Sequence, residues 1–393
     1  MTPRLYFEDP LLLAFRARVV AHGEIHRRPT AVLDRTAFCP ESGGQLADRG
    51  ALDGRTIVDV QEDDAGAVHH LVDGELPAPG AEVEGTVDRA RRRVHMALHT
   101  GQHVLSRALV ECAGAETASS RLGESGCTID VPIAIGEGDV ARSEDLTNSV
   151  VDDDLPIRAF FPTDAELSLL PLRRAPKVTD GIRVVRIGDF DVTPCGGTHC
   201  TRTAQIGLVR VTGVERYKGG TRVTFDAGAR ARTGLAAEAG VLRTLGRQLT
   251  CAPGEVPAAF DRLRRDLGEA REGLGQAHAR IADAMAQELL AAAKTSGDPH
   301  MVGALDGAPV ELLRAVASRL TTLEDGVALL AGPAADGTAI VVARGPKSAF
   351  DCGAFVKRVA AESGGRGGGR PERAEGRLPA GVDWPAVARR LIG

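Results

Sequence analysis

The chain has 393 residues, which is long for a single domain, so we expect two or three domains. Hydrophobic residues make up 43% of the chain, enough to build buried cores, whereas aromatic residues make up only 3%. The formal net charge of −5 argues against uniform binding along a nucleic-acid backbone, but it leaves room for a local basic surface.

The cysteines and the N-terminus indicate the compartment. The seven cysteines are scattered and odd in number, which favours reduced thiols over a disulfide framework. Glu8 and Asp9 interrupt the N-terminal segment, and its apolar run is too short for a secretory signal. No segment reaches the roughly 18 consecutive apolar residues that a membrane span requires. We therefore expect a cytoplasmic protein.

The first half of the chain predicts an α+β fold. Residues 1–88 contain short β-rich runs separated by Gly, Pro and Asp, which indicates a small β-barrel-like domain. From Asp88 the apolar spacing becomes helical, and Gly114 is the expected stop. Strand-like segments follow, with one helix expected over residues 141–154. We expect residues 89–230 to form an α/β two-layer core.

The second half predicts a helical connector and a smaller domain. Residues 231–296 are expected to be helical, and within them a set of apolar residues alternates at spacings of three and four. These residues are Phe260, Leu263, Leu267, Ala270, Leu274, Ala277, Ile281 and Ala284. A dimerising coiled coil, a helical hairpin and an amphipathic helix packed on its own domain all fit this pattern. Residues 297–393 alternate helices and strands, which indicates a small α/β domain containing a Gly/Arg-rich stretch at 364–377.

Two motifs indicate a metal site. His99 and His103 are four residues apart, so on a helix they share a face. Cys195 and His199 flank a pair of glycines, which disfavour a helix and allow a loop to approach a ligand closely. Three imidazoles and one thiolate suit tetrahedral zinc, one ion per chain. Four protein ligands would make a closed structural site, whereas three ligands plus water would make a catalytic one.

The order of the two motifs resembles the editing domain of alanyl-tRNA synthetase and the free-standing alanyl-tRNA editing proteins called AlaX. Residues 36–50 are similar to the glycine-rich segment of that family, with Cys39 where the family has Tyr. The resemblance implies that Gly43, Gly44 and Gln45 border the substrate pocket; a plain β-turn is the alternative interpretation. Residues 119–131 resemble the family's pocket strand, so Ser119 or Ser120 is expected to contact substrate.

The C-terminal stretch resembles the glycine-rich motif of the DHH-associated domain that ends alanyl-tRNA synthetase. Arg373 and Glu375 stand where the family has Met and Gln. Together with the helical connector, this tail implies the long form of AlaX. The match leaves no room for an aminoacylation domain, so we expect no tRNA charging. The chain contains no Asp-His-His triplet, so a DHH phosphoesterase is not expected.

The resemblance implies hydrolysis of mischarged Ser-tRNA(Ala), and also Gly-tRNA(Ala), at the aminoacyl ester. An alanine-charging pocket rejects smaller glycine and hydroxyl-bearing serine poorly, so a second site is needed. Gln45, Thr100 and His103 are the expected catalytic or water-holding residues. The arginines expected to contact tRNA are Arg91, Arg92, Arg366 and Arg370. A homodimer through the connector or C-terminal domain is also expected. The alternatives are a deacylase of threonyl type, a non-catalytic tRNA-binding zinc protein and a small-molecule hydrolase.

Overall fold

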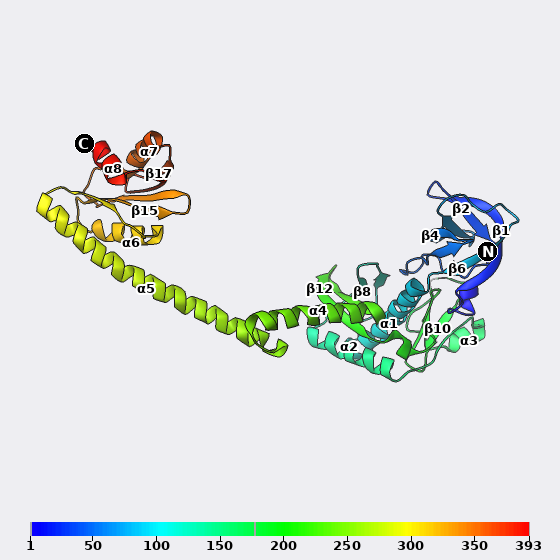
Figure 1. The fold of residues 1–393 in the computed structure, drawn as a ribbon. Coiled ribbons are helices and arrows are strands. Elements are labelled where there is room, and N and C mark those ends of the chain that lie inside the picture. Colours follow the sequence, from blue (N-terminus) through cyan, green and yellow to red (C-terminus); the bar gives the residue numbers. More distant parts are fainter. Residues whose placement is uncertain (1, 177, 393) are drawn as a thin grey trace. The chain divides into compact units, whose positions relative to one another are not determined.

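The computed structural model describes residues 2–176 and 178–392, and it divides into two compact units, one up to Thr244 and one from Leu245. The first unit begins with a closed six-stranded barrel, as the sequence predicted (Figure 1). Alternating burial, clearest in the last strand with Val83, Gly85 and Val87 inside, explains why these short runs form barrel strands. The strands are β1 (Ala14–Ile25), β2 (Arg28–Leu33), β3 (Gly50–Leu52), β4 (Arg55–Glu62), β5 (Val68–Val72) and β6 (Glu82–Val87), in the order β1-β2-β5-β4-β3-β6.

Helix α1 (Arg89–Ala113) follows the barrel directly. The Asp88 carboxylate caps it by accepting the backbone N–H groups of Ala90 and Arg91, and Gly114 ends it in a left-handed conformation with φ 62°. These are the start and the stop that the sequence predicted. The middle of α1 is almost entirely buried, so its side chains face other elements on every side.

The core of the first unit contains two small antiparallel sheets. Apolar side chains of helices α1 and α2 form one buried cluster with the four-stranded sheet, including Leu105, Val150, Ile129 and Phe225. This sheet consists of β7 (Ser119–Leu122), β8 (Cys127–Val131), β12 (Val209–Tyr217) and β13 (Gly220–Ala227), in the order β12-β13-β8-β7. The other sheet has the order β11-β10-β9, with β9 (Ile157–Phe160), β10 (Val184–Ile187) and β11 (Asp191–Pro194). The remaining helices are η1 (Leu5–Phe7), α2 (Glu137–Asp152), α3 (Asp164–Leu169) and η2 (Thr203–Ile206).

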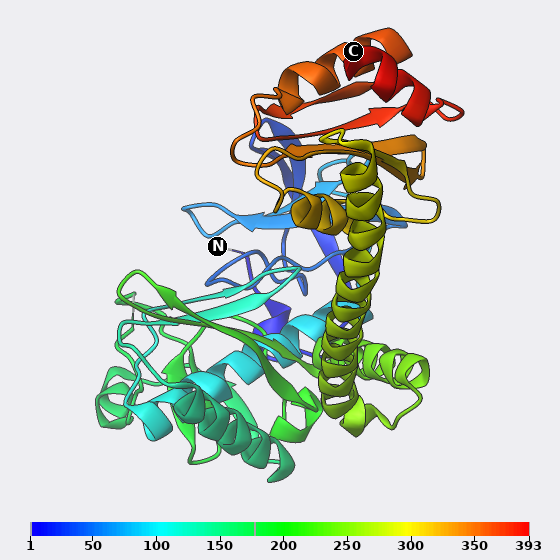
Figure 2. The ribbon, with the colours of Figure 1, turned by 90° about the vertical axis from the view of Figure 1, so that its left-hand side faces the viewer.

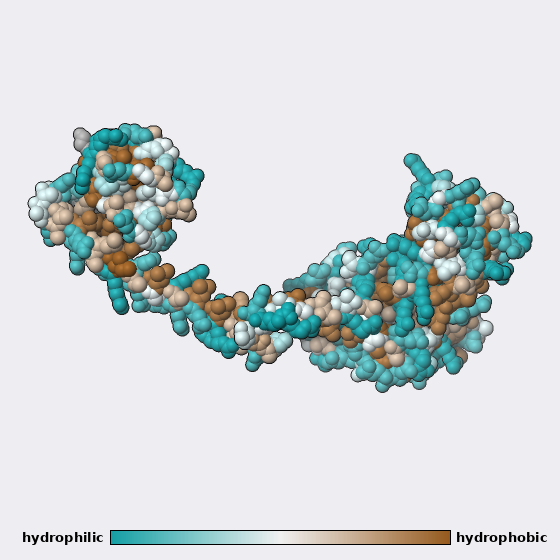
Figure 3. Space-filling view, viewed as in Figure 1, coloured by the Kyte–Doolittle hydropathy of each residue, from teal (hydrophilic) through white to brown (hydrophobic). Residues whose placement is uncertain are grey.

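The region expected to be one helical connector consists of two helices. Helix α4 (Gly228–Leu249) ends where Thr250 adopts φ 54°, and the short η3 (Pro253–Glu255) precedes α5 (Val256–Ser296), which has 41 residues. Large apolar residues along α5 are exposed, and Figure 3 shows brown patches along this helix. They are Phe260, Leu263, Leu267, Leu274 and Ile281. The expected coiled coil or hairpin stays a prediction, as does the four-part domain division.

The second unit contains a five-stranded sheet between two layers of helices, which confirms the predicted α/β domain. The end of α5 and α6 (Val310–Leu320) cover one face, and α7 (Cys352–Ser363) and α8 (Trp384–Ile392) cover the other (Figure 2). The strands are β14 (His300–Ala304), β15 (Val327–Ala334), β16 (Gly337–Arg344), β17 (Arg366–Arg370) and β18 (Arg373–Leu378), in the order β14-β15-β16-β18-β17.

The Gly/Arg-rich stretch is a β-hairpin and not a loop. Strands β17 and β18 pair in antiparallel fashion, and β17 forms the edge of the sheet. Its glycines have a packing reason, because a Cβ on Gly367 would lie 2.6 Å from Val356 Cγ1 of α7. Gly353 of α7 likewise approaches the backbone oxygen of Gly369, which a Cβ would meet at 2.7 Å. Close packing of α7 against β17 therefore explains a glycine-rich composition that is otherwise typical of loops.

Within the described residues, no helix is long and apolar enough to cross a membrane. The seven cysteines are free thiols.

Candidate metal centre

Helix α1 and the loop after β11 bring the four predicted ligands together. His99 and His103 lie one helical turn apart, and Cys195 and His199 lie in the loop that follows β11. The four candidate ligand atoms all lie within 4.8 Å of one another. Cys195 Sγ is 3.3 Å from His99 Nε2 and 3.3 Å from His199 Nε2. The two motifs, far apart in the sequence, thus form one compact cluster.

Gly197 is what lets the loop come this close to the helix. A Cβ at this position would lie 2.2 Å from His99 Cε1 and 2.4 Å from His99 Nδ1, and 2.8 Å from Gln45 Oε1. A side chain at Gly196 would meet nothing within 4 Å. The expected close approach of backbone to the site is therefore located at the second glycine of the pair.

Gln45 fixes the orientation of His99. Its Oε1 accepts from the Thr198 backbone N–H at 3.1 Å and from His99 Nδ1 at 2.7 Å, while its Nε2 donates to Thr198 Oγ1 at 3.0 Å. Because Nδ1 donates, the lone pair of His99 Nε2 points toward Cys195. Nε2 of Gln45 also lies 3.6 Å from the buried Cys39 Sγ. Gln45 is only 1% exposed, so its amide groups bond to the loop that carries Cys195 and His199 and not to solvent.

The other two imidazoles also face polar side chains, but only His199 lies within hydrogen-bond distance of its neighbour. Thr100 Oγ1 lies 3.3 Å from His199 Nδ1 and also accepts the Cys200 backbone N–H at 3.0 Å. His103 Nδ1 faces Asp191 Oδ2 at 3.7 Å. Outer partners of this kind set the tautomer of metal-binding histidines. Thr100 is fully buried, which restricts its direct contacts to neighbouring protein groups.

Two buried arginines complete this support, and the sequence reasoning missed both. Arg173 Nε donates to Asp191 Oδ1 at 2.8 Å and so stabilises the carboxylate beside His103. Arg183 donates to the backbone oxygens of Cys195 (3.0 Å) and Gly197 (2.9 Å), which holds the metal loop. No motif marks either residue, since both act through contacts that only the folded chain creates.

The electrostatics of Cys195 and His199 suit metal ligation. Burial raises the pKa of the Cys195 thiol, but the three nearby imidazoles, led by His99, outweigh it and bring the pKa well below its usual value. Burial, reinforced by the charge of His99, lowers the pKa of His199 to about 3. A thiolate and a neutral imidazole are the forms that bind metal. Tetrahedral zinc places sulfur and nitrogen ligands about 3.6 Å apart, close to the two separations observed here. The four residues therefore fit zinc.

A cavity of about 700 Å³ opens onto one side of this cluster. Its lining includes His99 and Cys195 but not His103 or His199. The size is typical of a ligand pocket. Other lining residues include Thr2, Arg4, Phe7, Ser42, Gly43, Gln102, Ser120, Phe161, Arg174, Asp180, Arg183 and Gly196. A small organic group in this cavity could reach the His99 and Cys195 side of the metal site.

Comparison with known proteins shows what the chain is similar to. The threonyl and alanyl tRNA synthetase second additional domain matches residues 182–224, which include Cys195 and His199, and the DHHA1 domain matches residues 297–390. The alanyl-tRNA editing protein AlaX-L of Pyrococcus horikoshii is 28% identical over 97% of this chain and 95% of its own length. The chain is AlaX-L-like.

The AlaX-L-like chain also matches part of larger proteins. The alanine–tRNA ligase of Pyrococcus furiosus is 32% identical over 96% of this chain, which spans only 42% of that ligase. The crystal structure of the C-Ala domain from Aquifex aeolicus alanyl-tRNA synthetase aligns with 23% of this chain and 86% of its own at 22% identity. Its TM-score of 0.22 is too low to support a comparison of folds.

In the AlaX-L-like protein, the Gly-Gly-Gln segment is a tight turn beside the cavity. Gly43 and Gly44 both have positive φ, 60° and 91°, which other residues rarely adopt. Gly44 O accepts the Leu122 backbone N–H at 2.8 Å, and a Cβ on Gly44 would meet Ser120 O at 2.8 Å. The turn is thus pinned to β7 and directs Gln45 toward the metal loop. Gly43 lines the cavity.

The two predicted pocket serines differ in position. Ser120 lines the cavity of the AlaX-L-like protein, and no hydrogen bond of its hydroxyl is found among the described side chains. Ser119 Oγ instead donates to Asp130 Oδ2 at 2.8 Å and faces a separate hollow. Only Ser120 is therefore placed to contact a ligand beside the metal centre.

The four predicted tRNA-binding arginines also differ. Arg366 and Arg370 are exposed on β17. Arg91 is half-buried and lies 3.4 Å from Glu124. Arg92 is only 1% exposed, and its Nε donates to both oxygens of the buried Asp48 at 3.1 Å. This burial corrects the prediction for Arg92, which joins α1 to the barrel and is inaccessible to a tRNA.

Proposed function

We propose that this protein is a trans-editing aminoacyl-tRNA deacylase that hydrolyses the ester of mischarged Ser-tRNA(Ala) and Gly-tRNA(Ala). The observation that carries the proposal is the cavity of about 700 Å³ walled by His99 and Cys195 of the metal cluster. The names of the relatives support the same substrate class, since one is an alanyl-tRNA editing protein and the other an alanine–tRNA ligase. The proposal includes no tRNA charging.

The metal centre supplies the reactive chemistry in this proposal. When bound, zinc is a Lewis acid that can lower the pKa of a coordinated water to about 7. His99, His103, Cys195 and His199 would hold the ion, and this chemistry requires that one of the four leave the metal free for water or that the shell expand to a fifth ligand. Gln45 acts through His99, since its amide oxygen fixes the imidazole orientation.

Thr100 acts in the same way through His199. Gln45 and Thr100 are thus positioning residues whose replacement weakens the metal site.

Selection for serine requires a polar partner for the serine hydroxyl. Ser120 and the Gly43 turn line the cavity near the metal cluster. A hydrogen bond to the substrate hydroxyl would favour serine, because alanine would leave the pocket's polar group unpaired once the substrate covers it. We assign this contact to Ser120. This contact gives no preference for glycine over alanine, since neither has a hydroxyl, so the proposal for Gly-tRNA(Ala) rests on the similarity to the alanyl-tRNA editing protein alone.

The tRNA body is bound mainly through the second unit in this proposal. Arg366 and Arg370 are exposed on the edge strand β17 of the DHHA1 domain. Exposed arginines bind backbone phosphates through charge and hydrogen bonds without reading sequence. If tRNA(Ala) contacts β17, the second unit binds the tRNA body and the first unit hydrolyses the ester.

Deacylation of three substrates tests the proposal. Zinc-loaded protein is incubated with Ser-tRNA(Ala), Gly-tRNA(Ala) and Ala-tRNA(Ala), beside the variants Cys195→Ala and Cys112→Ala. We expect rapid loss of serine, slower or no loss of alanine, and inactivity only for Cys195→Ala, because Cys112 lies outside the metal cluster. Binding of tRNA without cleavage of any ester would instead show a non-catalytic tRNA-binding zinc protein. With Ser-tRNA(Thr) added as a fourth substrate, its preferential cleavage would show a threonyl-type specificity.

A further inference from the structure

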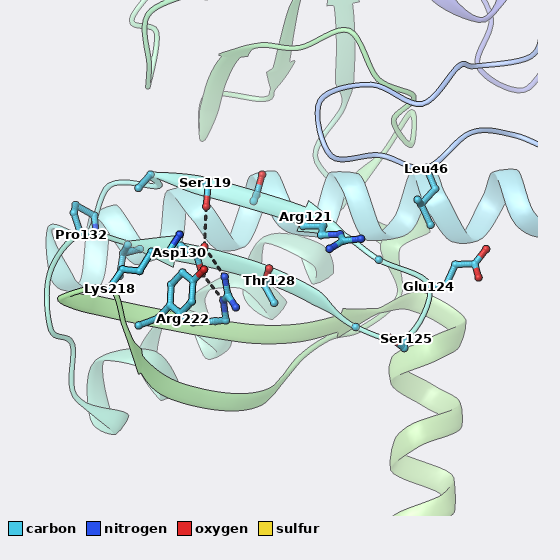
Figure 4. Close-up of a pocket in the computed structure, with 16 residues that line it drawn as sticks. Leu46, Ser119, Arg121, Glu124, Ser125, Thr128, Asp130, Pro132, Lys218 and Arg222 are labelled. Carbon is cyan, nitrogen blue, oxygen red and sulfur yellow. Dashed lines mark hydrogen bonds and ion pairs between the residues drawn. The ribbon is translucent and has the colours of Figure 1, made fainter. Parts of the chain in front are cut away.

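A second hollow lies on the polar face of the four-stranded sheet, outside the metal cavity. Its volume is about 880 Å³, and strands β7, β8 and the β12–β13 hairpin surround it (Figure 4). Strand alternation creates it, since Ile129 and Val223 point into the core while Thr128, Asp130 and Arg222 point outward. The hollow is polar and open, unlike the apolar core on the opposite face of the sheet.

The carboxylates of this hollow are already paired. Arg222 donates to Asp130 at 2.7 and 2.9 Å, and Ser119 donates to the same carboxylate at 2.8 Å, as Figure 4 shows. Glu124 likewise lies 3.3 Å from Arg49 and 3.4 Å from Arg91. Each carboxylate therefore already has a closer cationic partner and does not fully neutralise the other cations at the rim.

Two cations remain in excess. Neither Arg121 on β7 nor Lys218 forms an ion pair within the described parts of the chain. Lys218 Nζ lies 5.1 Å from the centre of the Tyr217 ring, and its charge also helps to lower the pKa of the Asp130 carboxyl. Both side chains are exposed. Lys218 is carried at the tip of the β12–β13 hairpin by a tight turn, with φ 47° at Lys218 and 83° at Gly219. In a chain of net charge −5, this hollow is locally positive.

An aromatic ring lies beside these cations. The Arg222 guanidinium stacks 3.5 Å from the centre of the Tyr217 ring. Aromatic rings are scarce in this chain, at 3% of residues, so this one is a distinctive feature of the surface. Cations that follow a strand beside an aromatic side chain are typical of surfaces that bind single-stranded nucleic acid.

Ser120 joins the hollow to the metal cavity. It lines both, because it lies between Ser119 and Arg121 on the edge strand β7. A chain whose end enters the metal cavity can therefore continue along β7 into the positive hollow. We propose that this hollow binds the phosphodiester backbone of the single-stranded RNA segment immediately 5′ of the aminoacylated terminal nucleotide, with Arg121 and Lys218 contacting phosphates. This inference rests on the proposed function, since that function places the ester in the metal cavity.

A charge-removing double variant tests the inference. Arg121→Gln/Lys218→Gln in the full-length, zinc-loaded protein is compared with Arg142→Gln, an exposed arginine of α2 outside both cavities. The substrates are Ser-tRNA(Ala) and 3′-O-seryl-adenosine, which has the ester but no phosphodiester. We expect KM for the tRNA to rise about tenfold or more, as loss of charged hydrogen bonds implies, with kcat within about twofold. Turnover of seryl-adenosine should not change.

Salt dependence gives a second readout. The KM for the tRNA should rise less steeply with salt in the double variant, by about 0.7 in the log–log slope for each lost phosphate contact. Equal KM and salt slope in the double variant and Arg142→Gln would overturn the inference. An equal loss on seryl-adenosine would overturn it too, because the damage would then lie at the ester.

Direct binding separates this inference from the proposed function. A fluorescent RNA oligonucleotide ending in CCA is titrated against the same proteins, without any ester to cleave. We expect the double variant to bind it about tenfold more weakly than the wild type and Arg142→Gln. If the wild type cleaves no ester, the proposed function fails, but this titration still shows whether the hollow binds single-stranded RNA. Unchanged binding, or binding of an acidic peptide in place of the RNA, would overturn the inference.

Discussion

At the scale of single residues, the absence of a side chain at Gly197 is as important to the metal centre as the ligands are. A methyl group there would overlap the His99 imidazole, at 2.2 and 2.4 Å. We expect Gly197→Ala to push His99 out of the cluster and to lower zinc affinity at least about tenfold. Gly196→Ala, where a Cβ meets nothing within 4 Å, is the matched control. Competition with a zinc chelator measures both, and equal affinities would show that the loop adjusts freely.

Gln45 provides a second test at this scale. Replacement by Leu removes the acceptor of His99 Nδ1 and of the Thr198 backbone N–H in a buried setting. We expect zinc affinity to fall about 10–100-fold, which is usual for loss of an outer partner. The control is Gln61→Leu, whose amide bonds to Asp59 on the barrel surface. If Gln45→Leu loses turnover but keeps full zinc affinity, Gln45 acts on substrate or water and not through His99.

At the scale of elements, the buried Arg92–Asp48 pair joins helix α1 to the barrel. Removing one member leaves the other charge buried and unpaired, which costs about 3–5 kcal/mol. We expect Arg92→Ala to lower the free energy of unfolding by this amount. Arg93→Ala, an exposed neighbour on the same helix, should change it by about 0.5 kcal/mol or less. Urea denaturation followed by circular dichroism compares the two, and similar midpoints would refute the structural role.

The β17–β18 hairpin allows a similar comparison in the second unit. A Cβ on Gly367 would lie 2.6 Å from Val356 Cγ1, whereas one on Gly368 would have only Lys357 Cε nearby, at 3.8 Å. We expect Gly367→Ala to destabilise the unit by about 1–3 kcal/mol through overpacking against α7. Gly368→Ala should be close to neutral. Thermal unfolding measures the difference, and equal melting temperatures would show that α7 can move away at little cost.

These elements also show which features could be predicted from the sequence. The barrel and α1 follow local rules, namely alternation in β6 and caps at Asp88 and Gly114, so they were predicted correctly. The metal cluster was predicted because each half is a short motif. The hairpin at 364–377 was missed because its glycines serve contacts with α7, which spacing does not reveal. Arg92 was misassigned for the same reason, since its partner Asp48 is 44 positions away.

At the scale of the whole molecule, the protein consists of two compact units with different chemistry. The first unit contains the metal cluster and both cavities described above, and the second contains the DHHA1 match and the exposed arginines of β17. Substitutions at the metal cluster of the first unit should then change hydrolysis of the ester, whereas substitutions on β17 of the second unit should change binding of the tRNA body. These separate roles of the two units can be tested by substitutions in the full-length protein.

The final prediction concerns Arg366 and Arg370. We expect Arg366→Gln/Arg370→Gln to raise KM for Ser-tRNA(Ala) about tenfold and to leave kcat and the turnover of seryl-adenosine unchanged, because these residues contact only the tRNA body. Lys347→Gln, an exposed cation elsewhere in the second unit, is the control.

Combining Arg366→Gln/Arg370→Gln with Arg121→Gln/Lys218→Gln in one protein tests whether the two sets of residues act independently. If the two sets bind separate parts of one tRNA, their effects on log KM should add, as expected for independent sites. Strong non-additivity would mean that the units do not hold the same tRNA independently. An unchanged KM in Arg366→Gln/Arg370→Gln alone would remove the second unit from recognition and leave the first unit to bind the substrate by itself.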